Sequence, residues 1–181
     1  STVPGATEFH GEGPGLLLRQ VQVDPGGGFV DGGPTPDGRS FAYIDYETGD
    51  VALWDLTTGE HRRLTHEGSW VAPEAYAINV SVSPDGSSVA YTWGVGQDSI
   101  VELRVVQLDG SPPRVLSSNR DGVGYPMSWS TDSRHLAVPI YDATDSTGAI
   151  AWVSVEDGSM RRLTDLPRWH WGTLSQIGRA H

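Results

Sequence analysis

The chain has 181 residues, of which 12 are basic and 23 acidic, so its formal net charge is −11 at pH 7. An acidic surface repels nucleic-acid phosphates and anionic membrane surfaces, so we expect no nucleic-acid partner and no membrane insertion. The sequence contains no cysteine, which excludes disulfides and thiolate metal sites, and no apolar run approaches the roughly 20 residues that span a bilayer.

The N-terminal part separates into a linker and a possible strand. Residues 1–15 have the composition of a linker, and because the chain begins with Ser1 rather than Met we expect the start of the gene to lie upstream. Residues 16–23 alternate in polarity, which predicts a strand. In a closed ring of sheets this strand would complete the outer edge of the last one.

The rest of the chain is repetitive. The segment from Thr35 to Thr65 returns at 83–117 and again at 130–164. The turn aspartates Asp37, Asp85 and Asp132 are 48 and 47 residues apart. Repeats of about 40–50 residues with four short strands each are typical of propeller blades.

Each copy is predicted to hold four strands. Inner strands are expected near 28–35, 77–83 and 124–130, second strands near 40–46, 87–93 and 134–141, third strands near 50–56, 99–108 and 149–155, and outer strands near 61–65, 113–117 and 160–164. The third strands are apolar on both faces, which indicates sheets that are covered on both sides. The blades are therefore expected at about 27–65, 77–117 and 124–164.

Small residues and turn residues support this division. Asp-Gly at 37–38 and at 85–86 supplies the positive φ of a tight turn, whereas Asp132-Ser133 predicts a turn of another type, because serine is strained there. Ala42, Ala90 and Ala137 occupy one place in the second strands. A small residue there lets a neighbouring blade approach closely.

The motifs TPDGR at 35–39, SPDG at 83–86 and RRLT at 62–65 and 161–164 resemble the WD-like propeller repeats of the TolB type. The resemblance covers about residues 27–176 and implies an all-β fold: three four-stranded antiparallel blades plus the inner strand of a fourth. The resemblance implies a scaffold that this repeat family uses in periplasmic binding proteins, in sensor regions and in the lid of prolyl oligopeptidase-like hydrolases. It favours an extracytoplasmic bacterial setting.

The C-terminal end suggests a truncated frame. Residues 169–176 resemble the inner strand of a fourth blade, so the partial propeller is expected to span 16–176. Read back into codons, residues 176–181 give CAG ATC GGA AGA GCA CAC, which resembles a common sequencing-library adapter. We therefore hypothesise that residues 177–181 are a non-native tail.

No motif points to catalysis, a cofactor or a metal. The sequence lacks GxSxG, a P-loop and GxGxxG, and its histidines show neither HxH nor HExxH spacing. Asp142 and Asp145, followed by Gly148, offer oxygen ligands for calcium but lack the EF-hand alternation, so a solvated hairpin tip is the plainer interpretation. We expect no catalytic residues and no cofactor.

Binding is expected at the loops that gather on one face of a propeller, because aromatic residues with a few acids are typical of partner surfaces. The candidate binding residues are Trp70, Tyr76, Trp93, Tyr125, Tyr141, Asp142, Asp145, Trp169, His170 and Trp171, and the same loops hold Tyr46, Glu47, Asp50, Glu74 and Asp98. The tryptophans at 70, 169 and 171 have an alternative role, which is to seal one blade against the next.

Three functions follow. The first is a non-catalytic module of a larger protein that binds a protein or a small ligand at its rim. The alternative is the regulatory lid propeller of a prolyl oligopeptidase-like hydrolase whose catalytic domain lies elsewhere. In the third, two three-blade chains assemble to complete one ring. The expected partners are accordingly a protein or small ligand at the propeller face, and missing blades of the same chain or a second copy.

Overall fold

A computed structural model describes residues 8–9, 18–19, 31–72, 74–96, 100–118, 125–126, 128–141 and 148–166. The chain divides into two units, residues 1–30 and 31–181. In the first, β1 (Glu8–Phe9) pairs antiparallel with β2 (Leu18–Arg19). Among the described residues, no helix has the length and apolar character needed to cross a membrane.

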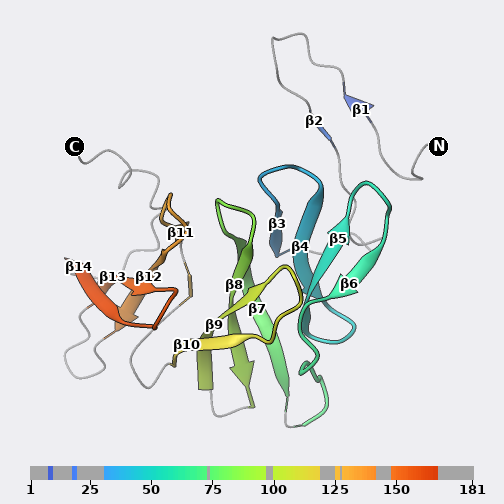
Figure 1. Cartoon of the computed structure of the whole chain (residues 1–181). Helices are drawn as coiled ribbons and strands as arrows, with labels where there is room; N and C mark the ends of the chain where they lie inside the picture. The colour runs from blue at the N-terminus through green and yellow to red at the C-terminus, as the bar shows by residue number, and fades with distance from the viewer. Residues whose placement is uncertain are drawn as a thin grey trace. The chain divides into compact units, whose positions relative to one another are not determined.

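The second unit holds three four-stranded antiparallel sheets, each with its strands in chain order (Figure 1). The first contains β3 (Gly32–Pro34), β4 (Ser40–Asp45), β5 (Asp50–Asp55) and β6 (His61–Arg63). The second contains β7 (Ala75–Val82), β8 (Ser88–Val95), β9 (Ile100–Gln107) and β10 (Arg114–Ser118). The third contains β11 (Ser128–Trp129), β12 (His135–Tyr141), β13 (Gly148–Ser154) and β14 (Met160–Leu166).

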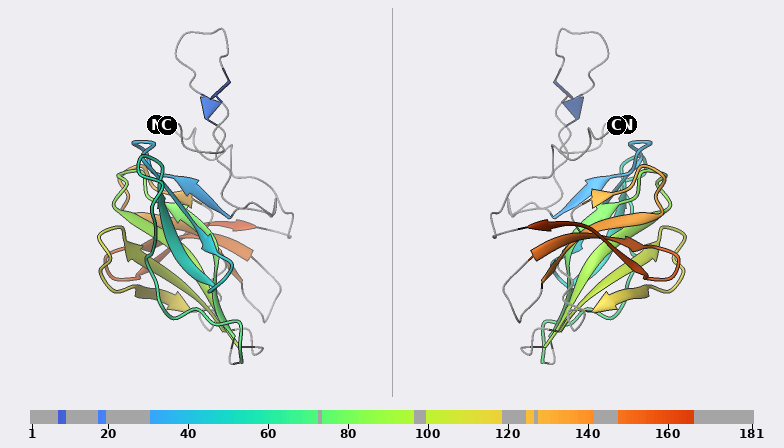
Figure 2. Two further views of the ribbon diagram at one scale, coloured as in Figure 1. Left: turned by 90° about the vertical axis from the view of Figure 1, so that its right-hand side faces the viewer. Right: turned by 90° about the vertical axis from the view of Figure 1, so that its left-hand side faces the viewer.

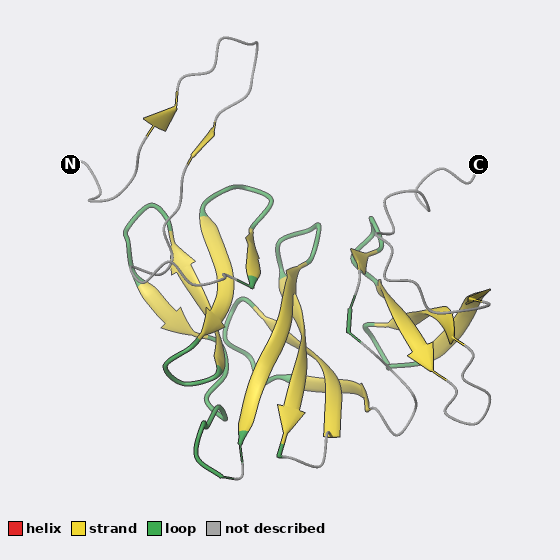
Figure 3. Cartoon of the chain, turned by 180° about the vertical axis from the view of Figure 1, so that it is seen from behind, coloured by secondary structure: helices red, strands yellow, loops and turns green. Residues whose placement is uncertain are grey.

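The all-β class and the four-stranded sheets are confirmed, and Figure 3 shows strands joined by loops throughout the described residues. Each strand predicted for the three blades overlaps an observed one. The predicted inner strand of a fourth blade, residues 169–176, lies outside the described residues, as does the tail at 177–181.

Apolar side chains fill the space between consecutive sheets. Ala42, Val51 and Leu53 of the first sheet, with Leu64 directly after β6, pack against β7, β8 and β9 residues, among them Val89, Tyr91 and Val106. Ala90, Leu103, Val105 and Leu116 use the opposite face of the second sheet to pack against Leu136, Val138 and Val153 of the third. The second sheet is therefore buried on both faces, which explains why its strands read as continuous apolar runs.

Polar contacts between sheets recur at equivalent positions. The Arg62 side chain of β6 donates to the Leu108 carbonyl, which follows β9 in the next sheet. The Arg114 side chain of β10 likewise donates to the Val155 and Glu156 carbonyls, which follow β13. The outer strands of the first and second sheets thus each hold the turn between the third and fourth strands of the sheet that follows.

The turns after the inner strands share one hydrogen-bond network. The hydroxyls of Thr35, Ser83 and Ser130 each donate to Oδ1 of the aspartate two residues later, at 2.6 Å in all three turns. That oxygen also accepts the backbone N–H two residues beyond the aspartate, at 3.0, 3.0 and 3.1 Å. These bonds lower the pKa of Asp37, Asp85 and Asp132, with the hydroxyl donor as the main cause.

The prediction of a different turn at Asp132-Ser133 is wrong. Ser133 has a φ of 60°, beside 67° for Gly38 and 72° for Gly86, so all three turns share the left-handed residue. Its hydroxyl gives a physical reason, because Ser133 Oγ accepts the backbone N–H of Asp85 in the previous sheet at 3.0 Å. The contact between sheets offsets the strain of a side chain at positive φ.

Ala90→Leu is expected to lower the free energy of unfolding by roughly 1–3 kcal/mol, because Ala90 has no exposed surface and larger side chains overpack a filled core. Thermal unfolding followed by circular dichroism measures the loss. Ala72→Leu, at an exposed loop position, is the control and should unfold like the parent. An unchanged melting temperature for Ala90→Leu would contradict close packing between the second and third sheets.

Thr35→Val is expected to raise the pKa of Asp37 toward its ordinary value near 3.8, because the variant removes the hydroxyl that donates to the carboxylate. In the parent the lowered pKa means that ionised Asp37 stabilises the fold above the unfolded-state pKa, and this stability is lost as the pH falls through the folded-state pKa. Carboxyl titration by NMR measures both values. Asp85 in the same variant is the internal control and should titrate as before.

Candidate functional site

An exposed aromatic platform lies where the first sheet connects to the second. Trp70 is 42% exposed and stacks on Tyr76, with ring centroids 4.8 Å apart and planes inclined by 26°. Trp70 Nε1 donates to the Tyr46 carbonyl at 2.9 Å, and Tyr46 itself is 55% exposed. We call Tyr46, Trp70, Val71 and Tyr76 the aromatic platform. It joins the turn after β4, the loop after β6 and the start of β7.

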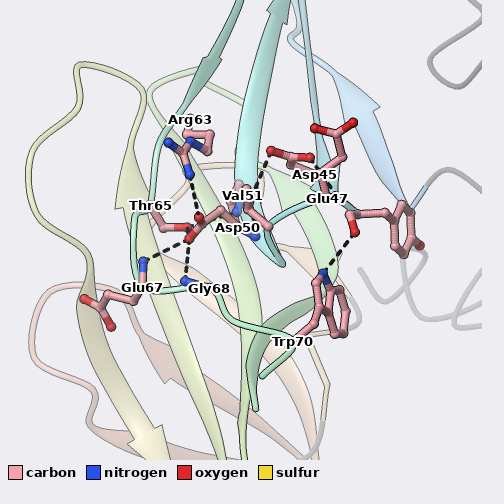
Figure 4. Close-up of polar contacts among 11 residues, drawn as sticks. Asp45, Glu47, Asp50, Val51, Arg63, Thr65, Glu67, Gly68 and Trp70 are labelled. Atoms are coloured by element: carbon pink, nitrogen blue, oxygen red, sulfur yellow. Dashed lines mark hydrogen bonds and ion pairs between the residues drawn. The ribbon is translucent and has the colours of Figure 1, made fainter. Parts of the chain in front are cut away.

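A buried carboxylate fixes the loop that carries Trp70. Asp50 is almost fully buried at the start of β5, and its Oδ1 accepts the Thr65 hydroxyl at 2.8 Å. The same oxygen accepts the backbone N–H groups of Glu67 at 3.0 Å and Gly68 at 2.9 Å (Figure 4). Its Oδ2 lies 3.5 Å from Arg63 Nη1. One side chain thus satisfies three donors of the loop, and Arg63 balances its charge.

The loop also passes very close to the turn between β4 and β5. A Cβ at position 68 would lie 2.3 Å from the Thr48 carbonyl oxygen and 2.8 Å from the Gly49 carbonyl carbon, closer than any side chain permits. Only glycine fits this close approach of two backbones. Together with Asp50, Gly68 fixes the path of the chain two residues before Trp70.

An arginine links this loop to the second sheet. Arg104 Nη1 lies 2.9 Å from Glu67 Oε2, while Nη2 lies 2.6 Å from Glu102 Oε2. The guanidinium carbon lies 5.0 Å from the ring centroid of Trp93, a cation–π contact. These two acids hold the pKa of Arg104 above its ordinary value against the opposing effect of burial. The arrangement is a structural connection between sheets.

The structure separates the predicted rim residues. Trp70 and Tyr76 are brought together. Trp93 is only 1% exposed and belongs to the core between the first two sheets, so it lies away from the exposed rim. The physical reason is that β8 continues to Val95, which places Trp93 inside a paired strand instead of in a loop.

Of the other predicted binding residues, only Tyr125 has a side chain within the described part of the chain. Tyr125 is exposed. Tyr141 ends β12, and its side chain lies outside the described residues. Asp98, Asp142, Asp145, Trp169, His170 and Trp171 also lie outside them.

One contributor to the site was missed from the sequence, and the role of another was not identified. Val71 is the most exposed of the large apolar residues in the described ranges and directly follows Trp70. Asp50 was placed among the rim residues, although its carboxylate points into the fold and serves the loop. Asp50 begins an apolar strand, and Thr65 follows the next strand. This spacing is a weak sequence signal for the anchoring role.

A separate groove lies between the second and third sheets. Its volume is about 460 Å³, and Arg114, Arg134, His135 and Glu156 are among the residues that line it. Both terminal nitrogens of Arg114 are already bound to the carbonyls of Val155 and Glu156. Across the described residues, no group of three or more histidine, aspartate or glutamate side chains is arranged to hold a metal ion.

No protein-family model matches the sequence, and no curated protein matches it. Among solved structures, a TolB of Agrobacterium tumefaciens is similar at 25% identity with a TM-score of 0.55, over 74% of this chain and 48% of that one. TolB from Acinetobacter baumannii is similar at 23% identity with a TM-score of 0.51, over 74% of this chain and 31% of that one.

The β-propeller domain of the Trilobed protease from Pyrococcus furiosus is similar at 17% identity with a TM-score of 0.57, over 78% of this chain and 43% of that one. The chain therefore spans less than half the length of each of these three proteins. The likeness concerns the four-stranded sheets described above.

Asp50→Ala is expected to destabilise the protein by about 1–3 kcal/mol, because three loop donors lose their acceptor in a partly buried site. Hydrogen exchange should accelerate at the amides of Glu67 and Gly68. Asp109→Ala, in an exposed turn, is the control and should leave both amides protected. Equal protection of the two amides in Asp50→Ala would contradict the anchoring role.

Proposed function

Because the described sheets are those of a TolB-like β-propeller, we propose that the chain is a non-catalytic binding module whose aromatic platform contacts a partner protein. The observation that carries the proposal is the stacked Trp70–Tyr76 pair, in which Trp70 is 42% exposed and Tyr76 is half-buried, although large aromatic side chains usually bury most of their surface. Aromatic residues supply large contact area at low entropy cost and dominate the energetics of many interfaces.

Preorganisation supports this role. The hydrogen bond from Trp70 to the Tyr46 carbonyl and the anchoring of the preceding loop by Asp50 hold the platform before any partner arrives. Binding then loses less conformational entropy than it would with a free loop. The affinity for a partner then depends on the rigid position of the platform as well as on the surface area buried on binding.

Charge and shape indicate the kind of partner. Glu47 and Glu74 are exposed and adjoin the platform in sequence, and the whole chain carries a net charge of −11. A protein segment that combines basic and apolar side chains is therefore favoured. A small ligand is less favoured at this place, because small-molecule sites are concave and the groove described above is lined by none of the platform residues.

The resemblance to TolB is also the basis on which we infer a bacterial extracytoplasmic setting. Cell fractionation of a bacterium that produces the full gene product would test it, and a cytoplasmic location would contradict it. The alternative of a lid propeller in a hydrolase draws on likeness to a protease propeller domain, which is a likeness of fold.

Trp70→Ala is expected to weaken binding about tenfold or more, as truncation of an aromatic hot spot does. The probe is a phage-displayed library of short peptides selected on the parent chain, with affinities of the selected peptides measured by calorimetry. Met160→Ala, which truncates a large apolar side chain of similar exposure in β14, is the control and should bind like the parent. Peptides that bind Trp70→Ala and the parent equally well would overturn the proposal.

A further inference from the structure

The groove between the second and third sheets is a surface separate from the aromatic platform. Its lining includes Arg114 from the second sheet and Arg134, Val155 and Glu156 from the third, and no residue of the platform. Its volume of about 460 Å³ lies within the roughly 300–1,000 Å³ of small-molecule sites. The groove is therefore large enough to hold a small organic molecule.

The third sheet directs Arg134 toward the second. Side chains alternate between the two faces of a sheet, and Arg134 lies two residues before Leu136, which packs against the second sheet. The Arg134 N–H donates to Asp132 Oδ1 at 3.1 Å, and the Arg134 carbonyl accepts the Val155 N–H at 2.8 Å. These bonds fix the backbone, whereas the exposed guanidinium has neither a hydrogen bond nor an ion pair among the described residues. It is therefore free to bind a ligand.

Arg114 supplies a second positive charge at the groove. Both of its terminal nitrogens donate to backbone carbonyls, those of Val155 and Glu156, which are neutral acceptors. Figure 2 shows the yellow strand β10, which begins at Arg114, beside the orange and red strands of the third sheet. Within the described part of the chain no carboxylate forms an ion pair with Arg114. The guanidinium is thus held in place with its charge unbalanced, so a ligand would not have to order it.

The carboxylates around the groove leave these charges available. Asp85 and Asp132, in the adjoining turns, each accept a hydroxyl and a backbone N–H. Glu156 is exposed, and its carboxylate has no partner among the residues that the structure describes. With His135 neutral, the two arginines and one glutamate that line the groove leave one net positive charge.

The equivalent positions between the first and second sheets carry less positive charge. Ser87 occupies the place of Arg134, because its N–H also donates to the turn aspartate and its carbonyl also accepts the N–H that follows the third strand. Arg62 occupies the place of Arg114. The junction of the second and third sheets therefore has one arginine more than the junction before it.

We propose that this groove binds a small organic anion that carries a carboxylate or phosphate group together with hydroxyl groups. A free guanidinium binds the oxygens of either group through two parallel N–H···O bonds, which Arg134 can supply. Arg114 adds a fixed positive charge, Glu156 accepts a ligand hydroxyl, and Val155 contacts the carbon skeleton. Because the whole chain carries a net charge of −11 and repels anions, binding here depends on the two arginines.

NMR titration of the 181-residue chain tests the proposal, with the backbone amides of Arg134 and Glu156 as reporters. The probes are glycerol 3-phosphate and malate, one for each anionic group. Saturable shifts of both amides are expected with at least one of these anions, and the tighter of the two identifies the anionic group. Glycerol, which lacks the charge, and sodium chloride at matched ionic strength should give no saturable shift.

Arg134→Gln should raise the dissociation constant of the bound probe about tenfold or more, because it removes the free guanidinium and keeps the backbone bonds of the turn. Arg39→Gln is the matched control. Arg39 is exposed and occupies the same turn position in the first sheet, where its N–H donates to Asp37 Oδ1 at 3.0 Å, but it does not line the groove. This variant should bind the probe like the parent.

Circular dichroism separates loss of binding from loss of folding. Arg134→Gln should show the strand spectrum of the parent, and Arg134→Lys, which cannot form the two parallel bonds, replaces it if the glutamine variant does not fold. Trp70→Ala should bind the probe like the parent, which keeps this test distinct from that of partner binding. No saturable shift with either anion, an undiminished affinity in the Arg134 variant, or an equal loss in Arg39→Gln would each overturn the proposal.

Discussion

The structure depends on one constraint, which is that a four-stranded sheet with two apolar faces must be covered on both. Burial of apolar surface is the dominant favourable term in folding, and the second sheet meets it by packing on the first through one face and on the third through the other. The small side chains of Ala42 and Ala90 permit this approach. The polar contacts between sheets, from Arg62 and Arg114, lie around these apolar clusters and fix their alignment.

The same constraint creates the platform. A chain that leaves one packed sheet for the next must turn beside buried strands, where its N–H groups lack water. Asp50 supplies the missing acceptor for two of them, and Gly68 removes the side chain that would prevent the close approach. Buried N–H groups that share one fixed acceptor hold the backbone around them in place. The rigid position of Trp70 is therefore a consequence of how the sheets are connected.

Much of this architecture is predictable from the sequence, because repeated turns and alternating polarity report local geometry directly. The positions of Asp37 and Asp85 in their turns follow from the residue types alone. Contacts between repeats do not. Ser133 adopts a positive φ because its hydroxyl meets the backbone of the previous sheet, and Trp93 is buried because β8 extends two residues further than expected. Asp85 lies 48 residues before Ser133 in the sequence. Contacts of this kind join residues that are distant in the sequence, so no local pattern identifies them.

Repetition within the chain offers an internal comparison that separates scaffold from function. Features found in every repeat, such as the hydroxyl–aspartate turn, are required by the fold. Features found once need another explanation. Asp50 is such a case, since the same register holds Glu102 in the second sheet, which binds Arg104, and Ala149 in the third. The loop that Asp50 anchors carries an exposed, stacked tryptophan, and a fold stabilised by buried apolar surface gains little from exposing it. The departure from the repeat therefore coincides with the surface that we propose for partner binding.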